Sequence, residues 1–228
     1  MRELLNNKIE YICDLEALRM RLHSEDMESE IFIRALELLE EARPLLKPAF
    51  AIKEVSVGQI GENGITIGGQ FFNSKIVANK LKDETNVFSY IATCGREISQ
   101  FIENTTDAID QYILDQIAYL AYLEAMNQMT LAAENQFGIK RQIRLCPGSV
   151  IDWSVADVKK IFALMDGLYQ GLDVSVLSSG LIDPLKSTSG IFYASDEEFE
   201  SCAICSRVNC ETRQMEYDED LHDKMVNL

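Results

Sequence analysis

The sequence is poor in the residues and patterns on which several enzyme classes depend. It holds two histidines, one tryptophan and four prolines among 228 residues. Because His23 and His222 stand near the ends in charged surroundings, we expect no histidine-centred acid–base or nucleophilic machinery. The phosphate loop, the dinucleotide fingerprint G-x-G-x-x-G, the zinc-protease motif H-E-x-x-H and the nucleophile elbow G-x-S-x-G are missing. These absences argue against the corresponding enzyme classes.

Long apolar runs and an excess of basic charge are missing as well. The longest apolar run, residues 117–123, ends at Glu124, far short of the roughly 20 residues that a membrane-spanning helix needs. Lys and Arg number 21 against 37 Asp and Glu, which gives a net charge of −16 and a pI near 4.5. Such a chain is a poor match for nucleic acid or an anionic membrane, since both attract basic surfaces.

Six cysteines stand in a chain whose N-terminal residues lack the uninterrupted apolar stretch of a signal peptide. That combination is typical of a reducing compartment rather than of a disulfide framework. We therefore expect a cytoplasmic protein.

Hydrophobic periodicity and turn residues predict an α+β fold. The expected helices cover residues 8–46, 75–82, 106–137 and 154–165, and the expected strands lie within 49–69, 86–93, 142–145, 174–177 and 187–193. The helix over 106–137 should be central, because almost every position from Ile117 to Met126 is apolar. Thr105 or Thr106 is its expected cap, and Gly138 its end.

These elements do not alternate in a βαβ rhythm, so we expect a single domain with a mixed or antiparallel sheet. The predicted organisation is an N-terminal helical segment (1–24), the α+β domain (25–195) and an acidic, cysteine-rich tail (196–228) that we expect to be irregular.

The tail carries the sharpest local signal, Cys202-Ala-Ile-Cys205-Ser-Arg-Val-Asn-Cys210. Three thiols spaced two and then four residues apart can converge on one metal, and thiolates select zinc or an iron–sulfur cluster. One such site needs four ligands; Cys94 is the first candidate for the fourth, and Cys146 the second. The alternative is three reduced surface thiols or a mobile redox tail.

A second dense segment runs from Arg144 to Tyr193. The Pro147-Gly148 turn at a strand end lets a ligand approach the backbone closely, and Arg144 has the geometry to grip a carboxylate. The run Ser187-Thr-Ser-Gly190 adds hydroxyl donors and another close-approach glycine. The alternative is a loop and an edge strand that merely close a sheet. Glu124, alone in its apolar run, either pairs with Arg144 or reaches a polar edge of its helix.

The order of motifs in this half resembles a known family. From Arg144 the chain contains R-x-x-P-G-S, Asp-Trp, a helix ending in L-M-D-G, V-S-V-L-S-S-G-L-I-D-P, S-T-S-G-I-F-Y and C-x-x-C-x-R-x-x-C-x-x-R. This order resembles the activation domain of vitamin-B12-dependent methionine synthase. It resembles more closely the small free-standing relatives of that domain that accompany corrinoid methyltransferases in anaerobes. The match spans about residues 140–214, and the implied fold about residues 25–214.

The resemblance implies a ligand and its contacts. In the methionine synthase domain, S-adenosylmethionine lies in a shallow groove and remethylates an inactive cobalamin after one-electron reduction. By resemblance, Arg144 would face the ligand's carboxylate, Cys146 and Pro147 would offer backbone contacts, and Phe192 and Tyr193 would line the pocket. The family pattern has Tyr where this chain has Ser149.

The expected function is therefore that of an accessory protein of corrinoid-dependent methyl transfer. Its partner would be a corrinoid-binding protein or corrinoid methyltransferase that carries the cobalamin, reactivated through S-adenosylmethionine or by reduction. Because the chain is acidic, we expect the contact to rest on basic groups of the partner, on the cobalamin, or on a locally neutral patch around Trp153. The alternative is a docking or redox module that bears iron–sulfur or zinc and binds no S-adenosylmethionine. Whether the chain is itself an enzyme stays open at this point.

Overall fold

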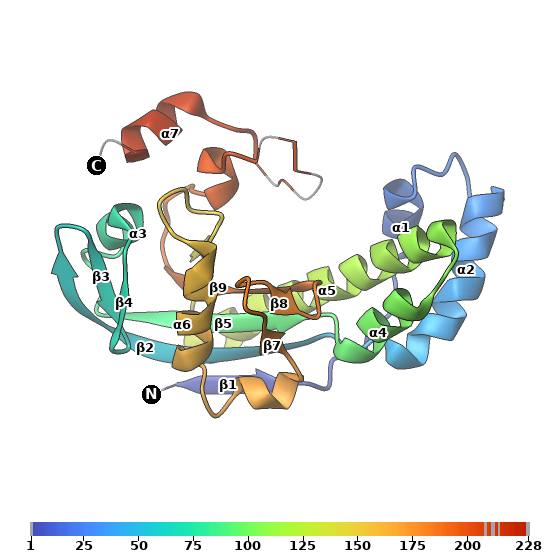
Figure 1. Cartoon of the computed structure of the whole chain (residues 1–228), viewed down its shortest axis with the longest axis horizontal. Coiled ribbons are helices and arrows are strands. Elements are labelled where there is room, and N and C mark those ends of the chain that lie inside the picture. Colours follow the sequence, from blue (N-terminus) through green and yellow to red (C-terminus); the bar gives the residue numbers. More distant parts are fainter. Residues whose placement is uncertain (1, 208, 211–212, 214, 227–228) are drawn as a thin grey trace.

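The computed structural model describes residues 2–207, 209–210, 213 and 215–226. Its centre is an antiparallel sheet of seven strands in the order β4-β3-β2-β5-β9-β6, with β1 paired to the first part of β2 (Figure 1). The strands of this sheet are β1 (Glu3–Asn6), β2 (Ala49–Gly61), β3 (Gly64–Ile67), β4 (Gln70–Phe72), β5 (Asn86–Thr93), β6 (Gln142–Leu145) and β9 (Ser187–Ala194). A separate short ribbon pairs β7 (Ser175–Val176) with β8 (Ile182–Asp183).

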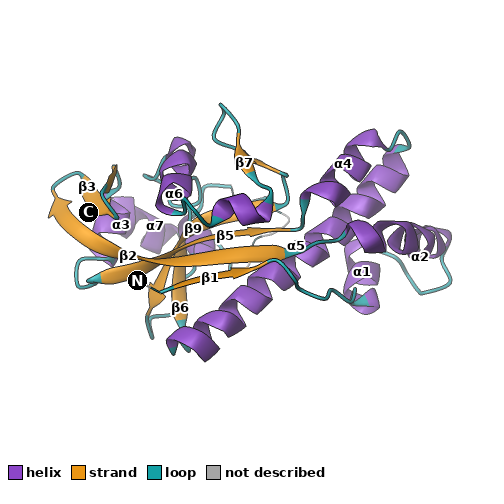
Figure 2. Cartoon of the chain, turned by 90° about the horizontal axis from the view of Figure 1, so that it is seen from below, coloured by secondary structure: helices purple, strands orange, loops and turns teal. Residues whose placement is uncertain are grey.

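Helices cover both faces of the sheet and extend beyond one end of it (Figure 2). The α-helices are α1 (Leu15–Arg21), α2 (Glu30–Ala42), α3 (Lys75–Lys80), α4 (Arg96–Asn104), α5 (Ala108–Phe137), α6 (Val158–Leu164) and α7 (Glu219–Val226). Short 3₁₀ turns are η1 (Arg43–Leu45), η2 (Val155–Asp157), η3 (Tyr169–Leu172) and η4 (Ser201–Ile204). None of the helices in the described part of the chain is long and apolar enough to cross a membrane.

The long helix α5 links the two halves of the core. Its C-terminal half lies on one face of the sheet, where Ala125 and Met129 pack among side chains of β2, β5 and β9. Its N-terminal half runs past the sheet and packs against α1, α2 and α4, where Ile113, Leu114 and Ile117 are fully buried. Burial on several sides explains why this helix is apolar nearly all round.

The ends of α5 follow from local sequence. Asp107 is the N-cap, and its carboxylate accepts hydrogen bonds from the backbone N–H groups of Ile109 and Asp110 at 2.9 and 3.0 Å. The predicted cap at Thr105 or Thr106 is therefore displaced by one or two residues, because a carboxylate both accepts these bonds and suits the positive end of the helix. Gly138 ends the helix in the left-handed conformation, as predicted.

The opposite face of the sheet carries α3, α6 and part of the tail. Ile143, Leu145 and Ile191 from the sheet pack there with Trp153 and with Phe199 of the tail. The expected α+β class with its long central helix is thus confirmed, and every strand pair in the described residues is antiparallel. The tail, expected to be irregular, contains η4 and α7.

Candidate functional site

The candidate site lies where one edge of β9 has no strand beside it. β5 pairs with β9 from Ser187 to Phe192, whereas β6 pairs with it only from Ile191 to Ala194. At Cys146 the chain turns away from β9, which leaves residues 187–190 with a strand partner on one side only. Such an edge offers backbone donors and acceptors to a ligand.

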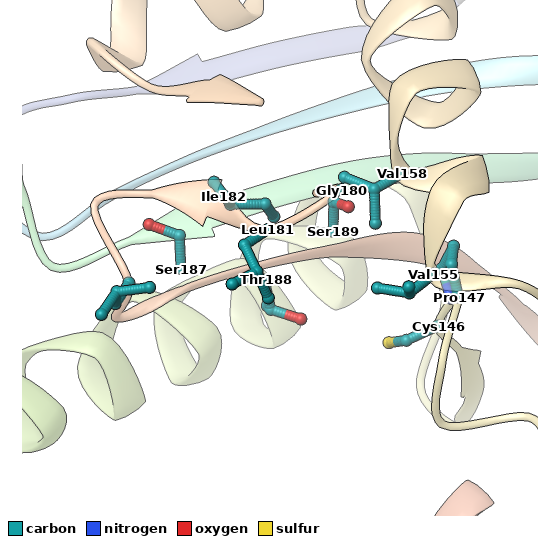
Figure 3. A pocket seen from close by; sticks show the side chains of 11 residues that line it. Cys146, Pro147, Val155, Val158, Gly180, Leu181, Ile182, Ser187, Thr188 and Ser189 are labelled. Carbon is teal, nitrogen blue, oxygen red and sulfur yellow. The ribbon is translucent and has the colours of Figure 1, made fainter. Parts of the chain in front are cut away.

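A cavity of about 160 Å³ lies along this edge (Figure 3). Its walls come from β9, from the turn after β6, from the start of the α6 region and from the loop around β8. The lining residues are Cys146, Pro147, Val155, Val158, Gly180, Leu181, Ile182, Leu185, Ser187, Thr188 and Ser189. The walls are therefore mainly aliphatic, with three hydroxyls and one thiol along the β9 side.

Strand alternation distributes these polar groups over two sides of β9. Thr188 and Cys146 are on the α5 side, and Ser189 is on the α6 side, near Val158 (Figure 3). The Ser189 side chain is buried, and within the described residues its hydroxyl has no hydrogen-bond partner. Since an unpaired buried hydroxyl is costly, Ser189 is suited to bond a ligand in the cavity.

The thiol of Cys146 is fixed by a close contact across β9. Tyr90 of β5 lies opposite Gly190 of β9, and Cys146 follows on the far side of that glycine. The hydroxyl of Tyr90 and the thiol of Cys146 are 3.0 Å apart. Burial raises the pKa of the Cys146 thiol, against the opposite influence of its hydrogen bond with Tyr90 and of the Arg144 charge. At neutral pH the thiol is therefore uncharged.

The turn that follows β6 is held by its own backbone. Gly148, with φ +84°, donates to the carbonyl of Trp153 at 2.8 Å, and both Ser149 N–H and Ser149 Oγ donate to the carbonyl of Cys146. The positive φ accounts for glycine at this position. Ser149, which stands where the resembled family has Tyr, thus stabilises the turn, and its hydroxyl is already engaged at 2.9 Å.

Asp152 and Trp153 attach this turn to the body of the domain. The Asp152 carboxylate accepts from Ser74 Oγ at 2.6 Å and from the backbone N–H groups of Lys75 and Ile76, so it helps to cap α3 from a distance. Trp153 is buried edge-on against Phe72, with ring centroids 5.5 Å apart. The expectation that Trp153 forms an exposed patch for a partner is wrong, because its indole lies in the core.

Arg144 lies on β6, directly opposite Phe192 of β9 and on the same face as Cys146. Its side chain is partly exposed, and its ion pair with Glu200 is long, at 4.0 Å. A guanidinium so weakly engaged keeps its capacity for a bidentate bond to a carboxylate. Glu124, one expected partner of Arg144, instead accepts a 2.7 Å hydrogen bond from Gln128 on its own helix.

Phe192 and Tyr193 lie on opposite faces of the sheet. Phe192 stacks on Phe88 in the α5-side core, with ring centroids 5.1 Å apart, whereas Tyr193 belongs to the core beneath α3 and α6. Consecutive residues of a strand alternate in this way. Neither ring lines the cavity beside Cys146 and Pro147, so the structure does not bring the two aromatics together at one ligand.

The cysteines expected to bind metal lie in the helical core and in the tail. Cys94 is buried among α-helical side chains, and its thiol donates to the carbonyl of Gly95 at 3.4 Å. Cys202, Cys205 and Cys210 are half-buried in the tail and form no disulfide. In the part of the chain that the structure describes, no three His, Cys, Asp or Glu side chains converge as metal ligands would.

Several residues that line the cavity were not predicted from the sequence. Val155, Val158 and the loop residues Leu181, Ile182 and Leu185 belong to segments that only the fold brings beside β9. Tyr90 and Gly190 set the position of the Cys146 thiol through a pairing register that no local motif reveals. The sequence signal for this contact is Gly190 in the Ser-Thr-Ser-Gly run, because a glycine in a strand indicates that another group lies close to the backbone there.

Comparison with known proteins supports the fold. No family model and no curated protein matches this sequence. Among solved structures, the chain resembles the MetH (methionine synthase) reactivation domain bound to AdoHcy, with a TM-score of 0.57 over 87% of this chain and 79% of that one. At 14% identity this likeness is one of fold.

Proposed function

We propose that this chain is an accessory protein of corrinoid-dependent methyl transfer, which binds a corrinoid-carrying partner and holds an S-adenosyl ligand beside β9. The observation that carries the proposal is the cavity along the free edge of β9, in a fold similar to the MetH reactivation domain bound to AdoHcy. The cofactor of the partner, cobalamin, would be returned to its active state in that complex.

The ligand's two ends have separate candidate contacts. Arg144 is the candidate for the amino-acid carboxylate, because its guanidinium is weakly engaged and stands on the Cys146 side of the cavity. Ser189 and Thr188 are candidates for the neutral, hydroxyl-bearing part of the ligand, since both line the cavity on β9. The aliphatic walls would exclude water from the buried part.

The rim of the same cavity is the candidate docking face. Leu185 is 68% exposed, Leu181 50% and Val155 43%, and all three line the cavity. Exposed aliphatic side chains around a ligand site suit the apolar face of a partner. Because the chain has a net charge of −16, its association with basic groups of the partner should become slower and weaker as the salt concentration rises.

Calorimetric titration with S-adenosyl ligands tests the ligand half of the proposal. Binding should weaken at least about tenfold in Arg144→Ala, the loss of one charge-assisted hydrogen-bond pair. Arg141→Ala is the matched control, because Arg141 lies three residues earlier, is more exposed and faces Asp196 and Glu198 instead. Absence of binding at millimolar ligand, or equal losses in both variants, would contradict the proposed site.

Titration against a purified corrinoid protein tests the partner half. An activator should bind the oxidised cobalt state more tightly than the methylated state, since a ligand that does not distinguish two states cannot shift them. Leu185→Asp should weaken this binding, whereas Ile12→Asp, at a residue that is 85% exposed in the N-terminal region, should leave it unchanged. Equal affinity for both cobalt states would leave only an adaptor.

A second candidate function is a thiol-based redox or docking module, with zinc or an iron–sulfur cluster in the tail. The observation that favours it is the way Arg213 closes the cysteine-rich segment. Its guanidinium donates to the carbonyls of Cys202, Cys205, Arg207 and Met215. One side chain thus holds the backbone carbonyls of both Cys202 and Cys205, although the thiols do not converge in this conformation.

Anaerobic purification with metal and sulfide analysis decides between the two candidates. About one zinc per chain, or several irons with matching sulfide, would favour the tail as a metal centre. Serine at Cys202, Cys205 and Cys210 should then remove the metal, whereas Cys13→Ser should not. Metal-free, folded protein that binds its corrinoid partner would contradict this candidate.

A further inference from the structure

Among the residues that the structure describes, every one that lines the cavity along the free edge of β9 (the β9 cavity) is electrically neutral at pH 7. The lining consists of aliphatic side chains, glycine, proline, three hydroxyls and one thiol. The walls therefore provide a ligand with hydrogen bonds and apolar contacts, but with no charged group that could pair with a charge on the ligand.

Acidic residues adjacent to the lining residues in sequence are already paired with cations. Asp157, which precedes Val158, contacts Lys160 at 2.7 Å. Asp183, which follows Ile182, contacts Arg96 at 2.7 Å. Their carboxylates are thereby held by cations outside the cavity.

The charged group closest in sequence to the cavity wall on the β6 side is a cation. Arg144 precedes Cys146 by two residues, and its charge acts on the Cys146 thiol. That thiol is the one titratable group among the described lining residues, and its raised pKa keeps it uncharged at pH 7. The local field along this wall is thus neutral to positive, although the chain as a whole is acidic.

We infer that the β9 cavity selects the neutral thioether form of an S-adenosyl ligand over the methyl-bearing sulfonium form. The inference rests on the proposed function, since it concerns the ligand of the same site. S-adenosylhomocysteine and S-adenosylmethionine share their adenosine and amino-acid groups and differ by one methyl group and one positive charge. Moving that extra charge from water into a neutral, largely aliphatic cavity is costly when no carboxylate receives it.

The global charge of −16 acts in the opposite sense, because it attracts any cation. This attraction is long-ranged and is screened over roughly 8 Å at physiological ionic strength. The lining residues, in contrast, contact the ligand directly. At moderate salt the local desolvation cost therefore decides the selectivity.

The consequence concerns the role of the ligand. A site that prefers the thioether is set to retain the demethylated ligand rather than to present the methyl donor. Reactivation of the partner's cobalt would then depend on the reductive route, with the bound ligand as a structural element of the complex.

Parallel calorimetric titrations with S-adenosylmethionine and S-adenosylhomocysteine test the inference at about 0.15 M and about 0.5 M salt. Between these two concentrations the screening length falls from roughly 8 Å to roughly 4 Å. We expect the thioether to bind tighter by about threefold or more, with a larger ratio at high salt, since a buried unpaired charge is penalised. Equal or tighter binding of S-adenosylmethionine would overturn the inference and leave the proposed function standing. Absence of binding for both would instead defeat the S-adenosyl part of the proposed function.

Two matched pairs of variants isolate the charge. Leu181→Asp and Leu181→Asn differ only in charge at an exposed rim position, and Thr188→Asp and Thr188→Asn do so on β9. Each Asp variant should bind S-adenosylmethionine about fivefold more tightly than its Asn counterpart, a modest ion-pair effect, with little difference for S-adenosylhomocysteine. The exposed Leu181 pair keeps the test valid if a Thr188 variant fails to fold. Equal affinities in the Asp and Asn variants would contradict the electrostatic basis of the inference.

Discussion

Tyr90 and Cys146 meet across a glycine. The two residues belong to different segments of the chain, yet the Tyr90 hydroxyl and the Cys146 thiol are 3.0 Å apart on the α5 face of β9. The contact exists because Gly190, which lies between them in the sheet, has no side chain. A Cβ atom at position 190 would stand 3.0 Å from Cys146 Sγ and 2.4 Å from the carbonyl oxygen of Leu145.

Gly190→Ala should therefore both destabilise the fold and disturb the cavity. The nearest obstacle is a backbone carbonyl, which cannot move aside easily, so we expect a loss of about 1–3 kcal/mol in the free energy of unfolding. Gly61→Ala is the control, since the nearest atom to its new Cβ is 3.9 Å away and a change within about 0.5 kcal/mol is expected. Urea denaturation of both variants measures the difference, and equal stabilities would show that β9 and β6 are less closely packed than described.

Trp153 gives a direct optical test of the core beneath α3. As the sole tryptophan of the chain, it should emit at short wavelength and resist quenching by iodide, because its indole is 1% exposed. Trp153→Ala should lower the free energy of unfolding by about 3–5 kcal/mol through loss of a large buried side chain. Trp153→Phe should recover part of that loss in circular-dichroism denaturation curves. Red-shifted, freely quenched emission would restore the view of Trp153 as a surface residue.

Stability should fall in alkaline solution, and Cys94 should contribute to the fall. Burial raises the pKa of Cys94 from 9.0 to about 12. The folded state thus holds a proton that the unfolded chain releases above pH 9, so this contribution is complete below pH 9 and is lost as the pH rises toward 12. The slope for one such group approaches about 1.4 kcal/mol per pH unit.

Urea denaturation of wild-type protein and Cys94→Ala between pH 7 and a pH of about 11 measures this contribution. Burial also raises the pKa of Tyr90, Tyr122 and Tyr193, so the variant should retain a shallower alkaline loss. Identical pH profiles for the two proteins would mean that the Cys94 thiol titrates normally in the folded state.

Arg213 should control access to the tail thiols. Loss of its hydrogen bonds to the carbonyls of Cys202, Cys205 and Arg207 opens the loop. Arg213→Ala should therefore raise the rate at which iodoacetamide labels Cys202 and Cys205 several-fold, as mass spectrometry of tryptic peptides would record. Arg207→Ala, at an exposed side chain, should label at the wild-type rate. Unchanged labelling in Arg213→Ala would contradict the organising role.

Local sequence patterns were sufficient for most of the secondary structure. The strands over 86–93 and 142–145 were predicted with their observed bounds, because β-branched and aromatic residues end there at turn residues. The long helix was predicted from apolar positions between a capping region and Gly138. In the tail, α7 was missed, since its eight residues are largely polar and carry little of the apolar periodicity on which helix prediction rests.

The composition of the candidate site, in contrast, was settled by tertiary structure. Sequence alone pointed to Arg144, the Pro147-Gly148 turn and the Ser-Thr-Ser-Gly run, because turn chemistry and donor types are local properties. It misplaced Trp153, and it grouped Phe192 with Tyr193, because whether a side chain enters the core, and on which face, depends on strand pairing and on what covers each face.

What the sequence determined by itself is most of the element order, the C-terminal end of α5, the acidic charge and the segment in which candidate ligand contacts concentrate. Only the tertiary structure decided that β6 pairs with the last residues of β9 and leaves residues 187–190 without a strand on that side. It also decided that the absence of a side chain at Gly190 lets Tyr90 contact Cys146, and that Asp157 and Asp183 pair with cations outside the cavity. The physical reason is distance along the chain. Propensity and capping act within a few residues, whereas pairing register, burial and charge compensation join residues that are dozens of positions apart.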